Sequence, residues 1–126
     1  MFGKITLYLL IMVASVLMII SCNQDKNIMK PPPPDPTNQA PRITAMSSST
    51  TTVQPDKVAA LYCDAYDPDG DSLIYRWTCD AGVFTSDNTV DWVHWKGPLT
   101  PGNYIIRVKV SDGQDADSSE IGIEVI

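Results

Sequence analysis

Aspartates in two turns have the clearest potential for chemistry in this sequence. Asp67, Asp69 and Asp71 alternate through one expected turn, and Asp112 begins a second acidic stretch. Carboxylate oxygens are the hard ligands that Ca²⁺ takes, so these four residues form a candidate calcium site if the fold brings both turns to one end. An EF-hand is excluded because no Glu occupies the twelfth position of the loop. The alternative is ordinary turn chemistry, since Asp caps turns and Gly70 permits a positive φ.

Two tryptophans suggest a second kind of site, for carbohydrate. On a strand over residues 90–95, Trp92 and His94 would face one side and Trp95 the other. An exposed tryptophan beside a histidine could stack on a sugar ring, so Trp92 and Trp95 are both candidate carbohydrate-binding residues. The alternative is that one tryptophan lies in the core and the other covers a sheet edge, because single exposed apolar residues are common.

Catalysis has little support. His94 is the only histidine, and the chain has no Gly-x-Ser-x-Gly or His-Glu-x-x-His motif. Phosphate-binding glycine loops and basic aromatic stripes are also missing, and the formal net charge is -6. An acidic chain is repelled by nucleic acid. We therefore expect no enzyme activity, no cofactor other than the candidate Ca²⁺, and no nucleic-acid partner.

The N-terminus has the features of an export signal. Lys4 precedes an apolar run from Ile5 to Ile20, about 16 residues, which is shorter than the roughly 20 that span a membrane. The run ends in Ile19-Ile20-Ser21-Cys22, which resembles the lipobox of bacterial lipoproteins. The resemblance implies a signal peptide over residues 1–21 and a lipid anchor on Cys22, carrying a diacylglyceryl thioether and an acyl chain such as palmitate. The alternative is an uncleaved N-terminal helix.

The rest of the chain divides into a linker and one small domain. Residues 22–40 contain five prolines and are predicted to form a proline-rich linker. Residues 41–126 contain short alternating segments separated by turns, which predict an all-β antiparallel sandwich of about seven strands. The expected strand markers are Ile43 and Ala45; Leu61, Cys63 and Ala65; Leu73, Tyr75, Trp77 and Cys79; Val83 and Phe84; Val90 to Trp95; Tyr104, Ile106, Val108 and Val110; and Ile121, Ile123 and Val125.

Several short motifs add a resemblance over residues 38–126. They are Asn38–Pro41, Cys63–Asp71, Tyr75–Trp77, Pro101–Tyr104 and Val110–Gly113. In this order and spacing they resemble the PKD-type immunoglobulin-like domains of bacterial surface proteins. The resemblance implies a seven-stranded Ig-like β-sandwich with an extracytoplasmic spacer, adhesion or recognition role. Residues 78–82 depart from the usual Gly-Asp-Gly turn of that family.

The two cysteines of the domain are candidates for a disulfide. Disulfides persist outside the cytoplasm, and Cys63 and Cys79 remain once Cys22 is assigned to lipid. In the implied fold both thiols point into one core, where a bridge closing a loop of about 16 residues would contribute about 3 kcal/mol. Trp77 would pack against it. The alternative is two free thiols.

These observations predict a non-catalytic lipoprotein of the cell envelope. Its Ig-like module would serve protein interaction, adhesion or structural display, with a membrane and an unidentified envelope protein or glycan as partners. Asn23, following the acylated cysteine, favours the outer membrane over the inner. The alternative is a carbohydrate-binding or accessory subunit of an envelope enzyme or transporter, stabilised by calcium.

Overall fold

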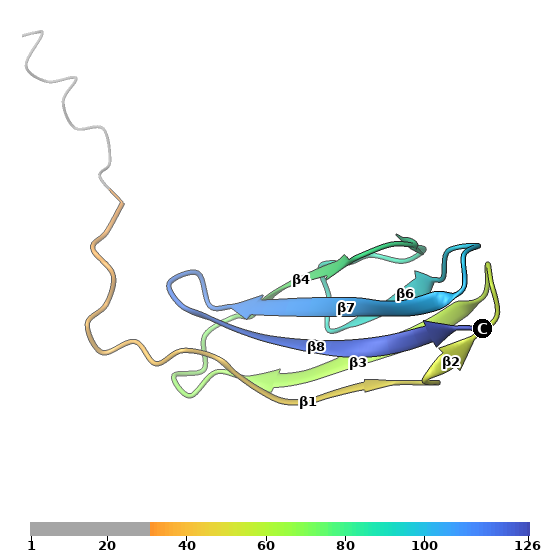
Figure 1. The fold of residues 1–126 in the computed structure, drawn as a ribbon. Helices are drawn as coiled ribbons and strands as arrows, with labels where there is room; N and C mark the ends of the chain where they lie inside the picture. The colour runs from red at the N-terminus through yellow and green to blue at the C-terminus, as the bar shows by residue number, and fades with distance from the viewer. Residues whose placement is uncertain (1–30) are drawn as a thin grey trace, which may run out of the picture. The chain divides into compact units, whose positions relative to one another are not determined.

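Two four-stranded sheets face each other in the computed structural model, which describes residues 31–126 (Figure 1). The first sheet has the order β1-β3-β6-β5 and the second the order β2-β8-β7-β4. The strands are β1 (Arg42–Ser48), β2 (Thr52–Val53), β3 (Val58–Tyr66), β4 (Ile74–Cys79), β5 (Val83–Phe84), β6 (Trp92–Lys96), β7 (Gly102–Ser111) and β8 (Ala116–Val125). The all-β sandwich predicted from alternation is therefore present, with eight strands and antiparallel pairing everywhere except between β2 and β8.

The described residues do not reach the N-terminal predictions. The signal peptide over residues 1–21, the lipidated Cys22 and the linker up to residue 30 lie outside them. The compact unit that holds the sandwich runs from Pro34 to Ile126. Residues 31–126 contain no helix that is long and apolar enough to cross a membrane.

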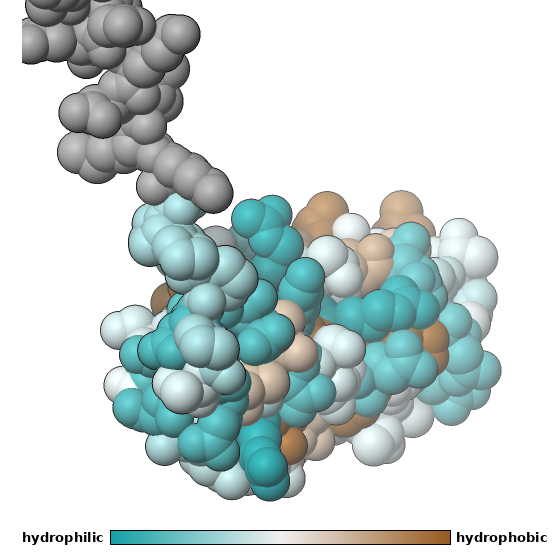
Figure 2. Space-filling view, turned by 90° about the vertical axis from the view of Figure 1, so that its left-hand side faces the viewer, coloured by the Kyte–Doolittle hydropathy of each residue, from teal (hydrophilic) through white to brown (hydrophobic). Residues whose placement is uncertain are grey.

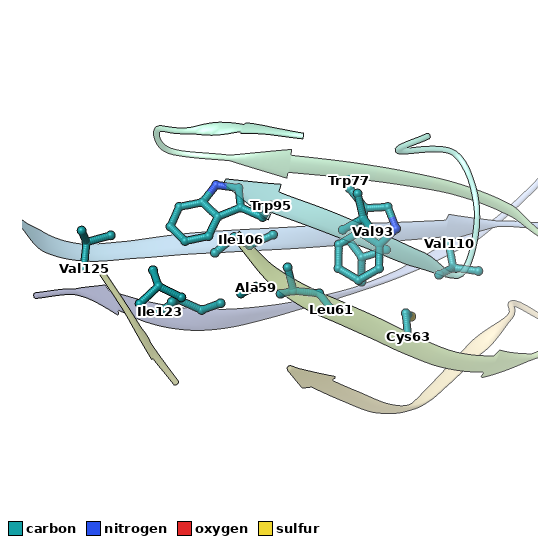
Figure 3. Packing of buried hydrophobic residues seen from close by; sticks show 12 residues of the cluster. Ala59, Leu61, Cys63, Trp77, Val93, Trp95, Ile106, Val110, Ile123 and Val125 are labelled. Carbon is teal, nitrogen blue, oxygen red and sulfur yellow. The ribbon is translucent and has the colours of Figure 1, made fainter. Parts of the chain in front are cut away.

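The core lies between the sheets, where alternate residues of the long strands point inward. Trp77 of β4 and Trp95 of β6 are its largest side chains, and both are buried. Each indole N–H donates to a backbone carbonyl, Trp77 Nε1 to Val90 at 2.8 Å and Trp95 Nε1 to Ala81 at 2.9 Å. Burial of both rings therefore leaves no indole donor unpaired. Figure 3 shows Cys63 and Val125 toward opposite ends of this core.

The inward faces expected for β3, β4, β7 and β8 are confirmed. The buried apolar residues are Val53, Ala59, Leu61, Cys63, Trp77, Val93, Trp95, Ile106, Val108, Val110, Ile123 and Val125. Ala65, Leu73, Tyr75, Cys79, Phe84, Tyr104 and Ile121 pack partly buried against them. Alternation identified most of these residues because the strands that carry them are long and have one buried face. Val53 of β2 and Ala59 of β3 were not among the expected inward residues.

Two features of the N-terminal strands differ from the expectation. The pairing of β1 with β3 shifts between Ile43 and Ala45, so Ala45 is exposed while Met46 packs on the core. Such a bulge reverses which residues face inward along the rest of the strand. The chain then crosses to the second sheet, where the two-residue strand β2 pairs in parallel with β8. This eighth strand was not expected.

The predicted Cys63–Cys79 disulfide is wrong, because both thiols are free in the structure. Cys63 lies near Tyr75: burial is the main cause of the raised pKa of that phenol, and the Cys63 thiol contributes to it. Cys79 is four residues further along β4, a rise of about 13 Å, and its thiol lies near the Gly82 carbonyl. Bridged cysteines need Cα atoms within about 7 Å of each other. Both residues face the core, but at different levels along the strands.

Candidate functional site

The turn between β3 and β4 brings three carboxylates together. Asp67 Oδ1 accepts hydrogen bonds from the backbone N–H groups of Asp69 (2.8 Å) and Asp71 (3.2 Å). One possible ligand atom from each of these three side chains lies within 4.8 Å of the others. The second oxygen of Asp67 is buried and has no hydrogen-bond partner among the described residues. These three aspartates therefore have suitable positions and donor atoms for a hard cation.

Asp112 has a different place from the one expected in the calcium site. Its Oδ1 accepts from the backbone N–H groups of Gln114 and Asp115, both at 2.7 Å, and its Oδ2 accepts from Asn38 Nδ2 at 2.9 Å. Asn38 also donates to Asp115 Oδ2 at 2.9 Å. The Asn38 hydrogen bond is the main cause of the lowered pKa of Asp112. Asp112 thus holds the β7–β8 loop and the incoming chain, and it does not join the group formed by the β3–β4 turn.

The two acidic loops lie at one end of the sandwich, as expected, and the chain that enters there connects them. Gln39 donates to Asp69 twice, from the backbone N–H at 2.7 Å and from Nε2 at 3.0 Å. Asp35 N donates to Gln114 Oε1 at 2.6 Å. We call this set of contacts, made by residues 35–39, the acidic-end clasp. Figure 2 looks at this end and shows a largely hydrophilic surface. Calcium binding by Asp67, Asp69 and Asp71 stays a prediction.

The outer face of the first sheet carries exposed aromatic side chains. Tyr62 of β3 and Trp92 of β6 are opposite one another in the pairing of the two strands. Tyr62 is 48% exposed, Tyr66 47% and Trp92 42%. The Trp92 and His94 rings meet edge to face, with centroids 5.2 Å apart and planes at 63°. Trp92 and His94 were expected to share a face; the structure shows that it is the outer one and adds Tyr62 and Tyr66.

Sequence reasoning missed the two tyrosines although a signal was present. They alternate with the inward residues Leu61, Cys63 and Ala65, which places them on the outward side of β3. What the sequence could not supply was the register that sets Tyr62 opposite Trp92. The closeness of Tyr62 to Trp92 on the outer face depends on that register.

The proposed carbohydrate-binding role of Trp95 is wrong. The ring is completely buried, and it packs near Tyr104 with ring centroids 6.2 Å apart. Trp95 and Trp92 are separated by an odd number of positions, so on a strand they face opposite sides. Trp92 alone remains a candidate for contact with a ligand.

The outer face of the second sheet has a different character. Arg107 of β7 forms ion pairs with Asp80 at 2.7 Å and with Glu120 of β8 at 3.2 Å. The Arg107 hydrogen bond is the main cause of the lowered pKa of Asp80. Within the described residues, charged side chains pair with one another on this face, while aromatic side chains lie together on the other.

Comparisons with known proteins give information on the fold. No protein-family model matches the sequence, and no curated protein matches it either. A nucleoside hydrolase-related hypothetical protein from Saccharophagus degradans, associated with carbohydrate metabolism, aligns with a TM-score of 0.51 and 17% identity over 70% of this chain. The D00-D0 domain of intimin aligns with a TM-score of 0.52 and 13% identity over 71% of this chain.

The fold is an Ig-like β-sandwich. This chain spans 25% of the first of those structures and 48% of the second. At these identities the similarity concerns the arrangement of strands. Membership of the PKD family, the lipid anchor and the absence of catalysis stay predictions.

Proposed function

We propose that this protein is a small lipoprotein of the bacterial cell envelope, lipidated at Cys22 and sorted to the outer membrane rather than the inner. Its Ig-like domain, of PKD type, is a non-catalytic module for recognition. The observation that carries the recognition role is the contrast between the two outer faces of the sandwich. Tyr62, Tyr66 and Trp92 expose apolar surface on one face, whereas Arg107 and its ion-pair partners occupy the other. Clustered exposed aromatic residues are typical of binding surfaces.

The attachment of the entering chain supports display of that face. Residues 35–39 are hydrogen-bonded to the acidic end, next to the start of β1. The aromatic face lies along the side of the sandwich, over β3 and β6. A partner could therefore contact the aromatic face without displacing the acidic-end clasp.

Metabolic labelling with an alkyne fatty acid tests the anchor. The full-length chain and its Cys22→Ala variant are produced in a bacterium with a lipoprotein-processing pathway, with Cys63→Ala as the matched cysteine control. We expect label and membrane association for the unaltered chain and for Cys63→Ala, and an unlabelled, uncleaved Cys22→Ala. An unaltered chain with no lipid on Cys22 would falsify the proposal.

A further inference from the structure

We propose that the outer face of the first sheet binds a neutral polysaccharide through an aromatic platform formed by Tyr62, Trp92 and His94. This inference rests on the recognition role proposed above and names the class of ligand. It does not depend on the lipid anchor at Cys22.

The platform is continuous across two strands. Tyr62 and Trp92 are paired between β3 and β6, and strands so paired lie about 4.8 Å apart. His94 follows two positions after Trp92 on the same face, and its ring lies against the indole. The outward side chains of Tyr62, Trp92 and His94 thus form a single surface, and the indole and imidazole rings are in contact within it.

Small side chains surround the platform and leave it open. Ser47 of β1 is opposite Tyr62, and Ala45 is the outward residue one pair further along β1. Ala60 is opposite His94. Because these three neighbours are short, they leave the aromatic rings accessible from the side of β1 and β3. An open aromatic surface suits the broad face of a sugar ring better than it suits a side chain that needs a pocket.

The polar atoms of the platform are also available. The two buried tryptophans use theirs inside the protein, Trp77 Nε1 donating to Val90 and Trp95 Nε1 to Ala81, and the partly buried Tyr104 donates from Oη to the Thr100 carbonyl at 2.8 Å. Within residues 31–126, no hydrogen bond engages Trp92 Nε1 or Tyr62 Oη. A pyranose offers an apolar C–H face to a ring and hydroxyls at its rim. It can therefore use both the apolar surface and the free donors of these side chains.

The charges near the platform favour a neutral ligand. Arg42 and Asp64, which flank it on the outward side of β1 and β3, have opposite signs. Lys96, further along β6, pairs with Asp56 at 2.7 Å. Although the chain has a net charge of -6, the outward charged residues of β1, β3 and β6 balance once Lys96 is paired with Asp56. A charged peptide or a charged glycan would be favoured only by a surface of opposite charge, because complementary potentials are what give specificity for charged partners.

Affinity electrophoresis of the full-length, detergent-purified protein tests the proposal. The probes are galactomannan, mixed-linkage β-glucan and xylan in the gel, with sedimentation on cellulose and chitin; alginate and heparin are the charged comparators. We expect retention by at least one neutral probe, and at least about fivefold weaker binding for Trp92→Ala and for Tyr62→Ala. Ile74→Ala, which removes an exposed apolar residue from the second sheet, should bind as the unaltered protein does.

Thermal midpoints of all variants are measured first, and Trp92→Phe replaces Trp92→Ala if the latter is unfolded. Retention of Trp92→Phe at an intermediate strength would support stacking. The proposal is overturned if no neutral probe is retained, if only charged probes are retained, or if the platform variants bind equally well. It is also overturned if sedimentation shows a dimer that Trp92→Ala abolishes, since a second copy would then occupy the face. Lipidation of Cys22 is scored separately, so loss of the anchor and loss of glycan binding are distinguished.

Discussion

Trp92 and Trp95 show how position on a strand determines the role of a side chain. Both belong to β6, but only Trp95 points between the sheets, where its N–H is paired with the Ala81 carbonyl. Trp92 is outward and meets His94. The same residue type therefore contributes to the core in one case and to a surface in the other.

Truncation of each tryptophan should separate these roles. Trp95→Ala is expected to lower the free energy of unfolding by about 3–5 kcal/mol, because it leaves a large cavity. Trp92→Ala should lower it by less than about 1 kcal/mol, because its ring is half exposed. Urea denaturation followed by circular dichroism measures both. Equal losses would contradict the assignment of the two rings.

The thiols provide a second test at this scale. Burial is the main cause that raises the pKa of Cys63 to about 11, and burial also raises the pKa of Cys79. A raised thiol pKa means that the folded state keeps a proton that the unfolded chain releases near pH 8.5. The related stability is fully present below that pH and is lost as the pH rises through about 11.

At pH 8 we therefore expect Cys63 to resist alkylation in the folded protein and to react fully in urea. Since Cys63 and Cys79 are free, dithiothreitol should leave the thermal midpoint unchanged. Mass spectrometry after alkylation in non-reducing urea should find both cysteines modified. A thermal midpoint that falls on reduction would show that the protein contains the Cys63–Cys79 disulfide after all.

Asp112 provides a prediction about pH. Its pKa is lowered, first by the Asn38 hydrogen bond. A carboxyl group with a depressed pKa stabilises the fold above the pKa of the unfolded chain, near 3.9, and loses that contribution as the pH falls through the folded value. Asp112→Ala should thus lower the thermal midpoint at pH 7, and the difference from the unaltered protein should shrink toward pH 3. Asp71→Ala, in the other acidic loop, serves as a control. A difference independent of pH would mean that the Asp112 charge is not involved.

At the scale of strands, alternation predicted which residues of the long strands face inward. It failed for a strand too short to alternate and for a strand interrupted by a bulge. The faces of β3, β4, β7 and β8 followed from a period of two, because one side of each strand is buried. β2 is two residues long and pairs in parallel with β8, so it has no alternation to detect. The bulge after Ile43 interrupts the alternation of β1, so that Met46 faces inward in place of Ala45.

The candidate sites show the same division. Parity correctly placed Cys63 and Cys79 on inward faces, but parity cannot say at which level along the core each thiol lies. It also separated Trp92 from Trp95, yet the meeting of Trp92 with Tyr62 depends on register between strands. The closeness of Asn38 to Asp112 could be anticipated from the turns that share one end of a sandwich.

Gly82, between β4 and β5, should be the least replaceable glycine in the described domain. It has a φ of 83°, and a Cβ there would meet the Lys96 carbonyl and lie 2.7 Å from Trp95 Nε1. Gly70 has a similar φ of 80° but nothing within 4 Å of its Cβ position, so it is a matched control. Gly70→Ala should lower the free energy of unfolding by about 1–2 kcal/mol, from backbone strain alone.

Gly82→Ala should add an overpacking cost of about 1–3 kcal/mol to that strain, because the clash involves backbone and a buried ring. Chemical denaturation of the two variants measures the difference. Similar losses for Gly82→Ala and Gly70→Ala would show that the loop relaxes away from Trp95.

At the scale of the whole molecule, the domain extends beyond its strands. The compact unit begins at Pro34, whereas the alternating pattern begins after Pro41. The difference is the acidic-end clasp, which is built from polar residues of low strand propensity and leaves no periodic signal. Its hydrogen bonds reach residues about 30 and about 75 positions away in sequence.

Two truncated chains test whether the clasp belongs to the folding unit. One starts at Pro34 and keeps the clasp; the other starts at Pro41 and removes Asn38 and Gln39 from their carboxylate partners. Without the bridging Asn38 amide, Asp112 and Asp115 lose a shared donor and repel one another.

The shorter chain should therefore have the lower thermal midpoint, and Asn38→Ala in the longer chain should reproduce part of the loss. Since charge repulsion contributes to it, the gap between the two chains should narrow in high salt. Identical midpoints at low salt would place residues 34–40 outside the folding unit and make them a spacer only.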